Sequence, residues 1–292
     1  PEIASEGGNL KTGEKLASTV IEETYFNSYV AHAPMEPHTA AAEFDGKKLT
    51  VWASTQTPFR VKELIAEQLS LPPDRVRVIT PYVGGGFGGK SASRQALEAA
   101  RLAKRIGKPV QVAWSRAEEF FYDTFRPAAI VKIKSGLSSS GQITFWDYNV
   151  YYAGMRGSKQ FYAVPHHKEV VHGRWRGSAG ENHPFGIGPW RAPANNTNTY
   201  ARDLHLNLMA AKAGVDPLQF RLKHLRDKRM INVLQAAAKA FRWQPLKPPS
   251  GRGHGIACGI DAGTYVAFMA EVEVDKSSGS VDVKRVVCAQ DM

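Results

Sequence analysis

The sequence predicts an α+β fold built from mixed sheets and several helices. Strand and helix patterns alternate over residues 48–114, which taken alone would favour a doubly wound parallel sheet. After residue 114 two long strand patterns follow one another, then an irregular stretch, then consecutive helix patterns. Because a doubly wound sheet needs a steady β–α–β rhythm, this mixture favours the α+β class.

Up to residue 79 we expect a loop, four strands and one helix. These are the loop 1–14, the strands 20–30, 39–44, 48–53 and 75–79, and the helix 61–69. Alternating apolar positions and β-branched or aromatic residues predict the strands. Asp45-Gly46 is a dipeptide favoured in tight hairpins, and Pro72-Pro73 ends the helix.

Residues 84–91 read Gly-Gly-Gly-Phe-Gly-Gly-Lys-Ser and are the most informative segment of the chain. Five glycines within positions 84–89 let the backbone adopt positive φ and approach a ligand closely. A strand pattern precedes the segment and a helix pattern over 92–107 follows it. A loop between a strand and a helix N-terminus offers free N–H groups to an anion.

The rest of the chain is expected to form five further strand segments and three helices. These are strands over 110–114, 129–133 and 143–152, an irregular region over 154–198, helices over 199–213, 217 onward and 231–241, and strands over 256–274 and 281–289. Gly214 is a typical helix stop, and Asp216-Pro217 begins the next helix. We expect a first domain over 1–150 that contains the glycine loop, and a second, truncated domain over 151–292.

Composition narrows the possible functions. The chain has 292 residues, of which 43% are hydrophobic and 22% charged, as in globular proteins. No apolar run approaches the roughly 20 residues of a membrane span. The net charge of +11 is scattered, and without zinc-finger or RNP motifs no nucleic-acid partner is expected. Cys258 and Cys288 lack metal-ligand spacing and are predicted to be buried thiols, so this chain carries no iron–sulfur cluster of its own.

Two motif interpretations of residues 84–91 predict nucleotide binding. The segment fits the P-loop pattern G-x-x-x-x-G-K-[ST], whose acidic partner would be Asp291, 200 residues after Ser91 (291 minus 91). It also fits the dinucleotide pattern G-x-G-x-x-G, although Glu118 and Glu119 match the required acidic position poorly. A nucleotide-binding protein and a non-catalytic remnant or scaffold are therefore the alternative functions.

Seven short motifs, in this order, resemble those of the xanthine oxidase family of molybdenum hydroxylases. They are HAPMEP at 32–37, WASTQTP at 52–58, GGGFGGK at 84–90, RAEE at 116–119, RPA at 126–128, RAP at 191–193 and GVDPLQFR at 214–221. The order extends over nearly the whole chain. The sequence resembles the molybdopterin-binding part of these enzymes, which include the aldehyde oxidases, and most of all the beta subunits of isoquinoline 1-oxidoreductase.

The resemblance implies an oxidoreductase that hydroxylates N-heteroaromatic compounds or aldehydes with oxygen from water, using a molybdenum–molybdopterin cofactor. It implies that Gln56 hydrogen-bonds an oxygen ligand of molybdenum and that Arg191 lies on the other side of the cofactor. The cofactor would also contact Gly85, Gly86, Phe87 and Gly88. Phe87 and Ser91 would face the substrate. The implied partners are a [2Fe–2S] small subunit and the C-terminal part of the large subunit.

Three departures from the family pattern qualify these expectations. Ser91 stands where purine-oxidising members often carry Glu, which favours a neutral heteroaromatic or aldehyde over a xanthine-like substrate. Ala194 replaces a Gly of the family and narrows the allowed backbone. The general-base Glu of the family's C-terminal G-x-G-E motif has no match, since only Glu118-Glu119 and Glu181 offer candidates. The catalytic residue is expected beyond the chain end, and the fragment alone is expected to be inactive. The sequence leaves open whether this fragment binds the cofactor.

No set of metal-ligating side chains is assigned from the sequence. The sequence also leaves the compartment open between cytoplasm and periplasm.

Overall fold

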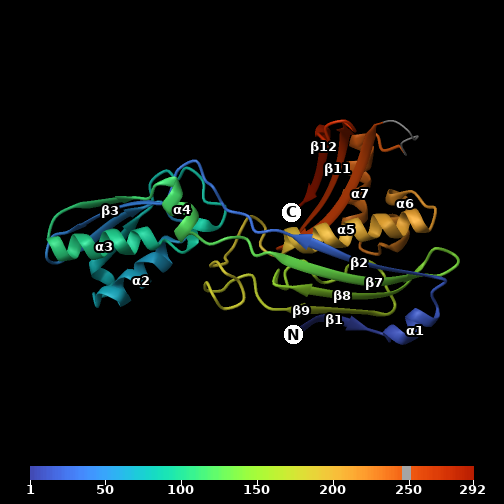
Figure 1. Cartoon of the computed structure of the whole chain (residues 1–292), viewed down its shortest axis with the longest axis horizontal. Helices are drawn as coiled ribbons and strands as arrows, with labels where there is room; N and C mark the ends of the chain where they lie inside the picture. Colours follow the sequence, from blue (N-terminus) through green and yellow to red (C-terminus); the bar gives the residue numbers. More distant parts are fainter. Residues whose placement is uncertain (245–250) are drawn as a thin grey trace. The chain divides into compact units, whose positions relative to one another are not determined.

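The computed structural model describes residues 1–244 and 251–292, which form two compact units (Figure 1). The larger unit comprises Pro1–Asn27, Ala128–Arg174 and Pro193–Met292, and the other, here the Gly-loop unit, comprises Ser28–Pro127 and Trp175–Ala192. This division differs from the expected boundary at residue 150. Residue 150 lies within a strand that pairs on both sides inside the larger unit, so the chain cannot separate there.

The larger unit contains a five-stranded sheet in the order β1-β9-β8-β7-β2. Its strands are β1 (Glu2–Gly7), β9 (His167–His172), β8 (Ile143–Tyr151), β7 (Ala129–Leu137) and β2 (Thr19–Asn27). Strands β8 and β9 are parallel, and the other pairs are antiparallel. The sequence predicted β2, β7 and β8 correctly. It missed β1, β9 and the short helix α1 (Leu10–Lys15), which lie in segments expected to be loops.

A second, three-stranded sheet and three helices complete the larger unit. They are α5 (Asn195–Lys212), α6 (Pro217–His224), α7 (Lys228–Phe241), β10 (Arg252–Asp261), β11 (Thr264–Val274) and β12 (Val281–Asp291). Helix α5 contacts β2 and β7 on one side and β10 on the other, so it lies between the two sheets (Figure 1). Trp146, Tyr148, Leu206 and Met209 fill the shared core, each at most 1% exposed.

The Gly-loop unit is a four-stranded sheet in the order β5-β4-β3-β6, packed against two helices (Figure 1). Its elements are β3 (Thr39–Phe44), β4 (Leu49–Ala53), α2 (Pro58–Leu69), β5 (Val76–Ile79), α3 (Arg94–Ile106), β6 (Val110–Ala113) and α4 (Arg116–Tyr122). Only β4 and β5 are parallel. Four buried alanines on α3 let this helix lie close to the sheet.

The predicted α+β class with mixed sheets is confirmed. The glycine segment is a loop between β5 and α3, as predicted, with a short 3₁₀ turn at Gly89–Ser91. Helix α3 begins at Arg94 rather than residue 92 because Ser93 adopts a left-handed conformation that a helix cannot include. None of the helices among the described residues is both long and apolar enough to span a membrane.

Candidate cofactor-binding site

The glycine loop of residues 84–89 has a backbone that few other sequences could adopt. Gly85 and Gly88 have φ of 95° and 114°, a region that L side chains rarely enter. A Cβ on Gly88 would lie 1.9 Å from the carbonyl oxygen of Pro189. Phe87 also has positive φ, at 53°. Such a conformation in a bulky residue stores strain and occurs preferentially at functional sites.

Gln56 is held against this loop from the end of the β4 strand. The side-chain Oε1 of Gln56 accepts a hydrogen bond from the N–H of Gly88 at 2.9 Å. The backbone N–H of Gln56 donates to the carbonyl of Lys90 at 2.9 Å. A Cβ on Gly86 would lie 2.5 Å from Oε1 of Gln56. The predicted proximity of Gln56 to the loop is thus confirmed.

These contacts leave several hydrogen-bond donors at the loop without an acceptor. Within residues 1–244 and 251–292, the Nε2 of Gln56 has no hydrogen-bond acceptor, nor have the backbone N–H groups of Gly85, Gly86 and Phe87. Gly86 is buried, so bulk water has little access to this residue. Successive free N–H groups in such a loop form an anion-binding concavity. The loop therefore fits an anionic, oxygen-rich group such as a molybdenum cofactor.

Arg191 lies on Phe87, the residue at the tip of the loop. The backbone N–H of Arg191 donates to the carbonyl of Phe87 at 2.8 Å, and its guanidinium carbon lies 4.7 Å from the centroid of the Phe87 ring. This is cation–π geometry, which fixes both side chains. The structure thus brings together Gln56, the glycine loop and Arg191, although they are distant in sequence.

Lys90 rules out the P-loop interpretation. Its side chain is fully buried, and its Nζ lies 2.6 Å from Oε2 of Glu36, which also accepts the N–H of Gly84. Burial raises the pKa of Glu36, but the hydrogen bonds from Lys90 and Gly84 outweigh it and lower the pKa. A P-loop lysine must instead reach the phosphates of a nucleotide. The proposed acidic partner, Asp291, forms an ion pair with Arg229 at 2.9 Å.

His32 connects three segments at the base of the loop. Its Nδ1 lies 2.7 Å from Oδ2 of Asp123, and its Nε2 lies 2.7 Å from the carbonyl oxygen of Pro189. The carbonyl of Pro189 and the ionised carboxylate of Asp123 both accept hydrogen bonds, so these contacts favour the doubly protonated ring. Burial lowers the pKa of His32, but the hydrogen bond and charge of Asp123 raise it above the usual value. A Cβ on Gly89 would lie 2.6 Å from Oδ2 of Asp123, so this pair also shapes the loop.

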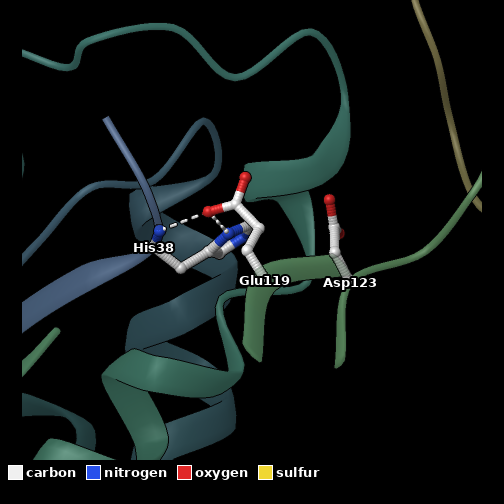
Figure 2. Close-up of side chains that lie close together, drawn as sticks. All are labelled: His38, Glu119 and Asp123. Carbon is white, nitrogen blue, oxygen red and sulfur yellow. Dashed lines mark hydrogen bonds and ion pairs between the residues drawn. The ribbon is translucent and has the colours of Figure 1, made fainter. Parts of the chain in front are cut away.

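A neighbouring cluster has residue types that often bind metals. Potential ligand atoms of His38, Glu119 and Asp123 lie within 4.8 Å of one another (Figure 2). Glu119 is already occupied: its Oε2 accepts the backbone N–H of His38 at 2.8 Å, and its Oε1 pairs with Arg116 at 3.1 Å. Asp123 already pairs with His32, at 2.7 Å. The cluster is therefore a buried charge network that holds α4 against the entry to β3.

The sequence did not reveal this network, although its acids lie in or near the RAEE motif. The two glutamates considered as bases have structural roles instead. Glu118 forms a capping box with Ser115 at the N-terminus of α4, and Glu119 is 1% exposed within the network. Their carboxylates serve the fold, so the structure assigns no general base to this pair.

The remaining predicted residues divide between the two units. Ser91 follows the loop, and its carbonyl accepts a hydrogen bond from Oγ1 of Thr57 at 3.1 Å. Ala194 lies in the larger unit with φ of 63°, so the residue that replaces the family's Gly does adopt a backbone suited to Gly. Cys258 is buried, and burial raises its pKa to about 12. Cys288 is exposed, so the prediction of two buried thiols was wrong for this residue.

Comparisons with known proteins show which proteins this chain resembles. The chain is 31% identical to aldehyde oxidoreductase molybdenum-binding subunit PaoC of Escherichia coli O157:H7, covering 95% of this chain and 41% of that protein. It is 26% identical to isoquinoline 1-oxidoreductase subunit beta of Brevundimonas diminuta, covering 90% of this chain and 36% of that protein. The fold matches quinoline 2-oxidoreductase from Pseudomonas putida 86 with a TM-score of 0.74 at 18% identity, covering 96% of this chain and 43% of that one.

The chain spans less than half the length of each of these proteins. A family model described as the molybdopterin cofactor-binding domain matches residues 2–225, which is most of the chain and includes the glycine loop, Gln56 and Arg191. The chain therefore belongs to the molybdopterin cofactor-binding domain family of the xanthine oxidase-type molybdenum hydroxylases.

Proposed function

We propose that this chain holds the molybdenum cofactor in an enzyme that hydroxylates N-heteroaromatic compounds or aldehydes with oxygen from water. The relatives it matches include proteins named for aldehyde and isoquinoline oxidation. The observation that carries the proposal is the row of free donors at the glycine loop, next to an amide whose carbonyl is already engaged. This arrangement leaves the amide N–H of Gln56 for an oxygen atom of the cofactor.

Each residue of the proposed site has a distinct role. The N–H groups of Gly85, Gly86 and Phe87 bind anionic oxygen atoms of the cofactor, and Gly88 fixes the amide of Gln56. Arg191 supplies positive charge and stacks on Phe87, whose exposed ring faces the substrate. Ser91 lies on the substrate side. When bound, the molybdenum centre supplies the oxygen transfer and two-electron redox chemistry, which protein side chains alone cannot provide.

Electrons must leave such a centre after each turnover. We propose that a [2Fe–2S] subunit accepts them and that further polypeptide of the large subunit completes the cofactor pocket and contributes the general base. Some of the matched relatives are likewise named as subunits.

The test uses the complete gene product that contains this chain, produced with its iron–sulfur partner. Molybdenum is measured by mass spectrometry, and oxidation of benzaldehyde and quinoline is followed with a dye acceptor in ¹⁸O-water. We expect one molybdenum per large subunit and ¹⁸O in the product. Gln56→Ala should lower molybdenum content and turnover, because the amide donor is lost, whereas Gln111→Ala, an exposed position on β6, should change neither. Wild-type protein without molybdenum, or Gln56→Ala with unchanged content and turnover, would contradict the proposal.

A further inference from the structure

A cavity of about 330 Å³ opens beside the glycine loop, entirely within the Gly-loop unit. Gly88 and Ser91 form one wall, the first turns of α2 form a second, and the segment around Ile187 forms a third. The volume is at the lower end of the range for small-molecule sites, so it suits a ligand of one or two rings.

The charged side chains that line this cavity are all positive. Arg60 and Arg176 both line it, and none of its lining residues is acidic. Neither guanidinium forms an ion pair with any residue in the described part of the chain. Arg176 lies over the ring of Trp175, with its guanidinium carbon 4.3 Å from the ring centroid. Stacking on the face orients the guanidinium and leaves its N–H edge available for an anion.

The other part of the lining is apolar. Val61 and Leu64 of α2 and Ile187 opposite them supply aliphatic side chains. A hydrated inorganic anion gains nothing from such surfaces, whereas an aromatic ring is stabilised by burial against them. Two guanidinium groups beside an apolar wall therefore match a planar ring that carries a carboxylate, which arginine binds in bidentate fashion.

We propose that this cavity binds the carboxylate of an aromatic substrate, so that the enzyme acts on anionic heteroaromatic compounds or carboxylated aromatic aldehydes. This inference rests on the proposed function and narrows its substrate class. The neutral substrate expected from the sequence followed from Ser91 alone, because the two arginines are separated by more than 100 residues and their convergence is visible only in the fold.

Binding to the purified chain tests the inference without requiring turnover. Isothermal titration calorimetry compares benzoate with benzamide, which has nearly the same shape without the charge, and with inorganic phosphate. We expect benzoate to bind at least tenfold more tightly than benzamide and than phosphate. Arg60→Gln and Arg176→Gln should each weaken benzoate binding about tenfold, as for loss of one charge-assisted contact, and leave benzamide binding unchanged.

Arg105→Gln, an exposed position on α3 outside the cavity, is the matched control and should bind benzoate like the wild type. Both cavity arginines are exposed. Circular dichroism is used to check that each variant is folded. Equal binding of benzoate and benzamide, no binding of benzoate, or equal affinity of phosphate and benzoate would overturn the carboxylate assignment. So would wild-type affinity for benzoate in both cavity variants.

Molybdenum content of the complete gene product separates this inference from the proposed function. Molybdenum present without charge-selective binding overturns only the substrate class. Charge-selective binding without molybdenum supports the cavity as a carboxylate site and overturns the assigned reaction.

Discussion

Single residues position the glycine loop through close steric and hydrogen-bonding contacts. Gln56 occupies the space that a side chain at position 86 would need, and His32 and Asp123 occupy the space beside position 89. The loop is therefore defined by its neighbours as much as by its own glycines. These contacts lead to two predictions.

Gly86→Ala tests the fit between the loop and Gln56. The added Cβ would lie 2.5 Å from Oε1 of Gln56, so the amide must move away from Gly88. Because Gly86 does not have positive φ, the effect is steric rather than conformational. We expect a loss of about 1–3 kcal/mol in the free energy of unfolding and a fall in bound molybdenum in the complete protein. Gly255→Ala, where the added Cβ meets no atom within 4 Å, is the control and should be near neutral.

His32→Gln should lower the free energy of unfolding by an amount that depends on pH. The pKa of His32 is higher in the fold than in the unfolded chain, so the folded state binds the proton more tightly. Its contribution to stability is therefore complete below about pH 6.5 and is lost as the pH rises through the folded pKa. Urea unfolding should show a larger difference between wild type and variant at pH 6 than at pH 9, by about 1–2 kcal/mol. An equal difference at both pH values would show that the ring is neutral in the fold.

At the scale of elements, the N-terminus of α5 shows a local conflict between sequence and structure. Ala194 has φ of 63° and ψ of −45°, and the N–H of Asn195 donates to the carbonyl of Pro193 at 2.7 Å. These angles and this hydrogen bond define the rarer, strained form of the γ-turn. Helix α5 begins in this position because its buried residues pack between two sheets, and the packing outweighs the strain at its first turn.

Ala194→Gly should relieve this strain. Glycine adopts positive φ without Cβ collisions, so we expect a gain of about 1 kcal/mol in the free energy of unfolding, seen as a higher melting temperature. Ala211→Gly, at an exposed position in the same helix, is the matched control. It should lose about 1 kcal/mol, because glycine is unfavourable in a helix interior. The same sign for both substitutions would disprove the strain at position 194.

At the scale of the whole chain, each unit has its own core, and the larger one is tied together by a buried charge. Arg221, the last residue of the GVDPLQFR motif, is fully buried in α6. Its Nη2 lies 3.0 Å from Oδ1 of Asp203 in α5 and donates to the carbonyl of Ile256 in β10 at 3.1 Å. One side chain thus links two helices and the second sheet, which explains a motif that the cofactor site does not use.

Arg221→Met should lower the free energy of unfolding by about 3–5 kcal/mol, because Asp203 would lose a buried cationic partner. The double variant Arg221→Met/Asp203→Leu should be less destabilised than the sum of the two single variants, since it also removes the carboxylate that Arg221→Met leaves with only the longer ion pair to Arg202, at 3.5 Å. Chemical denaturation of the four proteins provides the measurement. Additive losses would show that the two side chains contribute independently.

The sequence by itself determined the elements whose signals are local, and the family. The Asp45-Gly46 hairpin, the helix after the glycine loop and the Asp216-Pro217 helix start depend on residues a few positions apart, so pattern and propensity were enough. The order of short motifs located the glycine loop and Gln56. Gln56 follows β4 and the loop follows β5, and these two strands are adjacent and parallel, so their ends bring Gln56 and the loop together.

Only the tertiary structure decided the features that depend on distant segments. Strands β1 and β9 pair across some 160 residues through main-chain hydrogen bonds, which leave no side-chain pattern for the sequence to show. In the sequence Lys90 matches a phosphate-binding lysine, but in the structure it is buried against Glu36. Glu119 was a candidate base, but its carboxylate pairs with Arg116 and accepts the backbone N–H of His38. A side chain's chemistry depends on its partners and its exposure to water, and both are set by the packing of residues far apart in the chain.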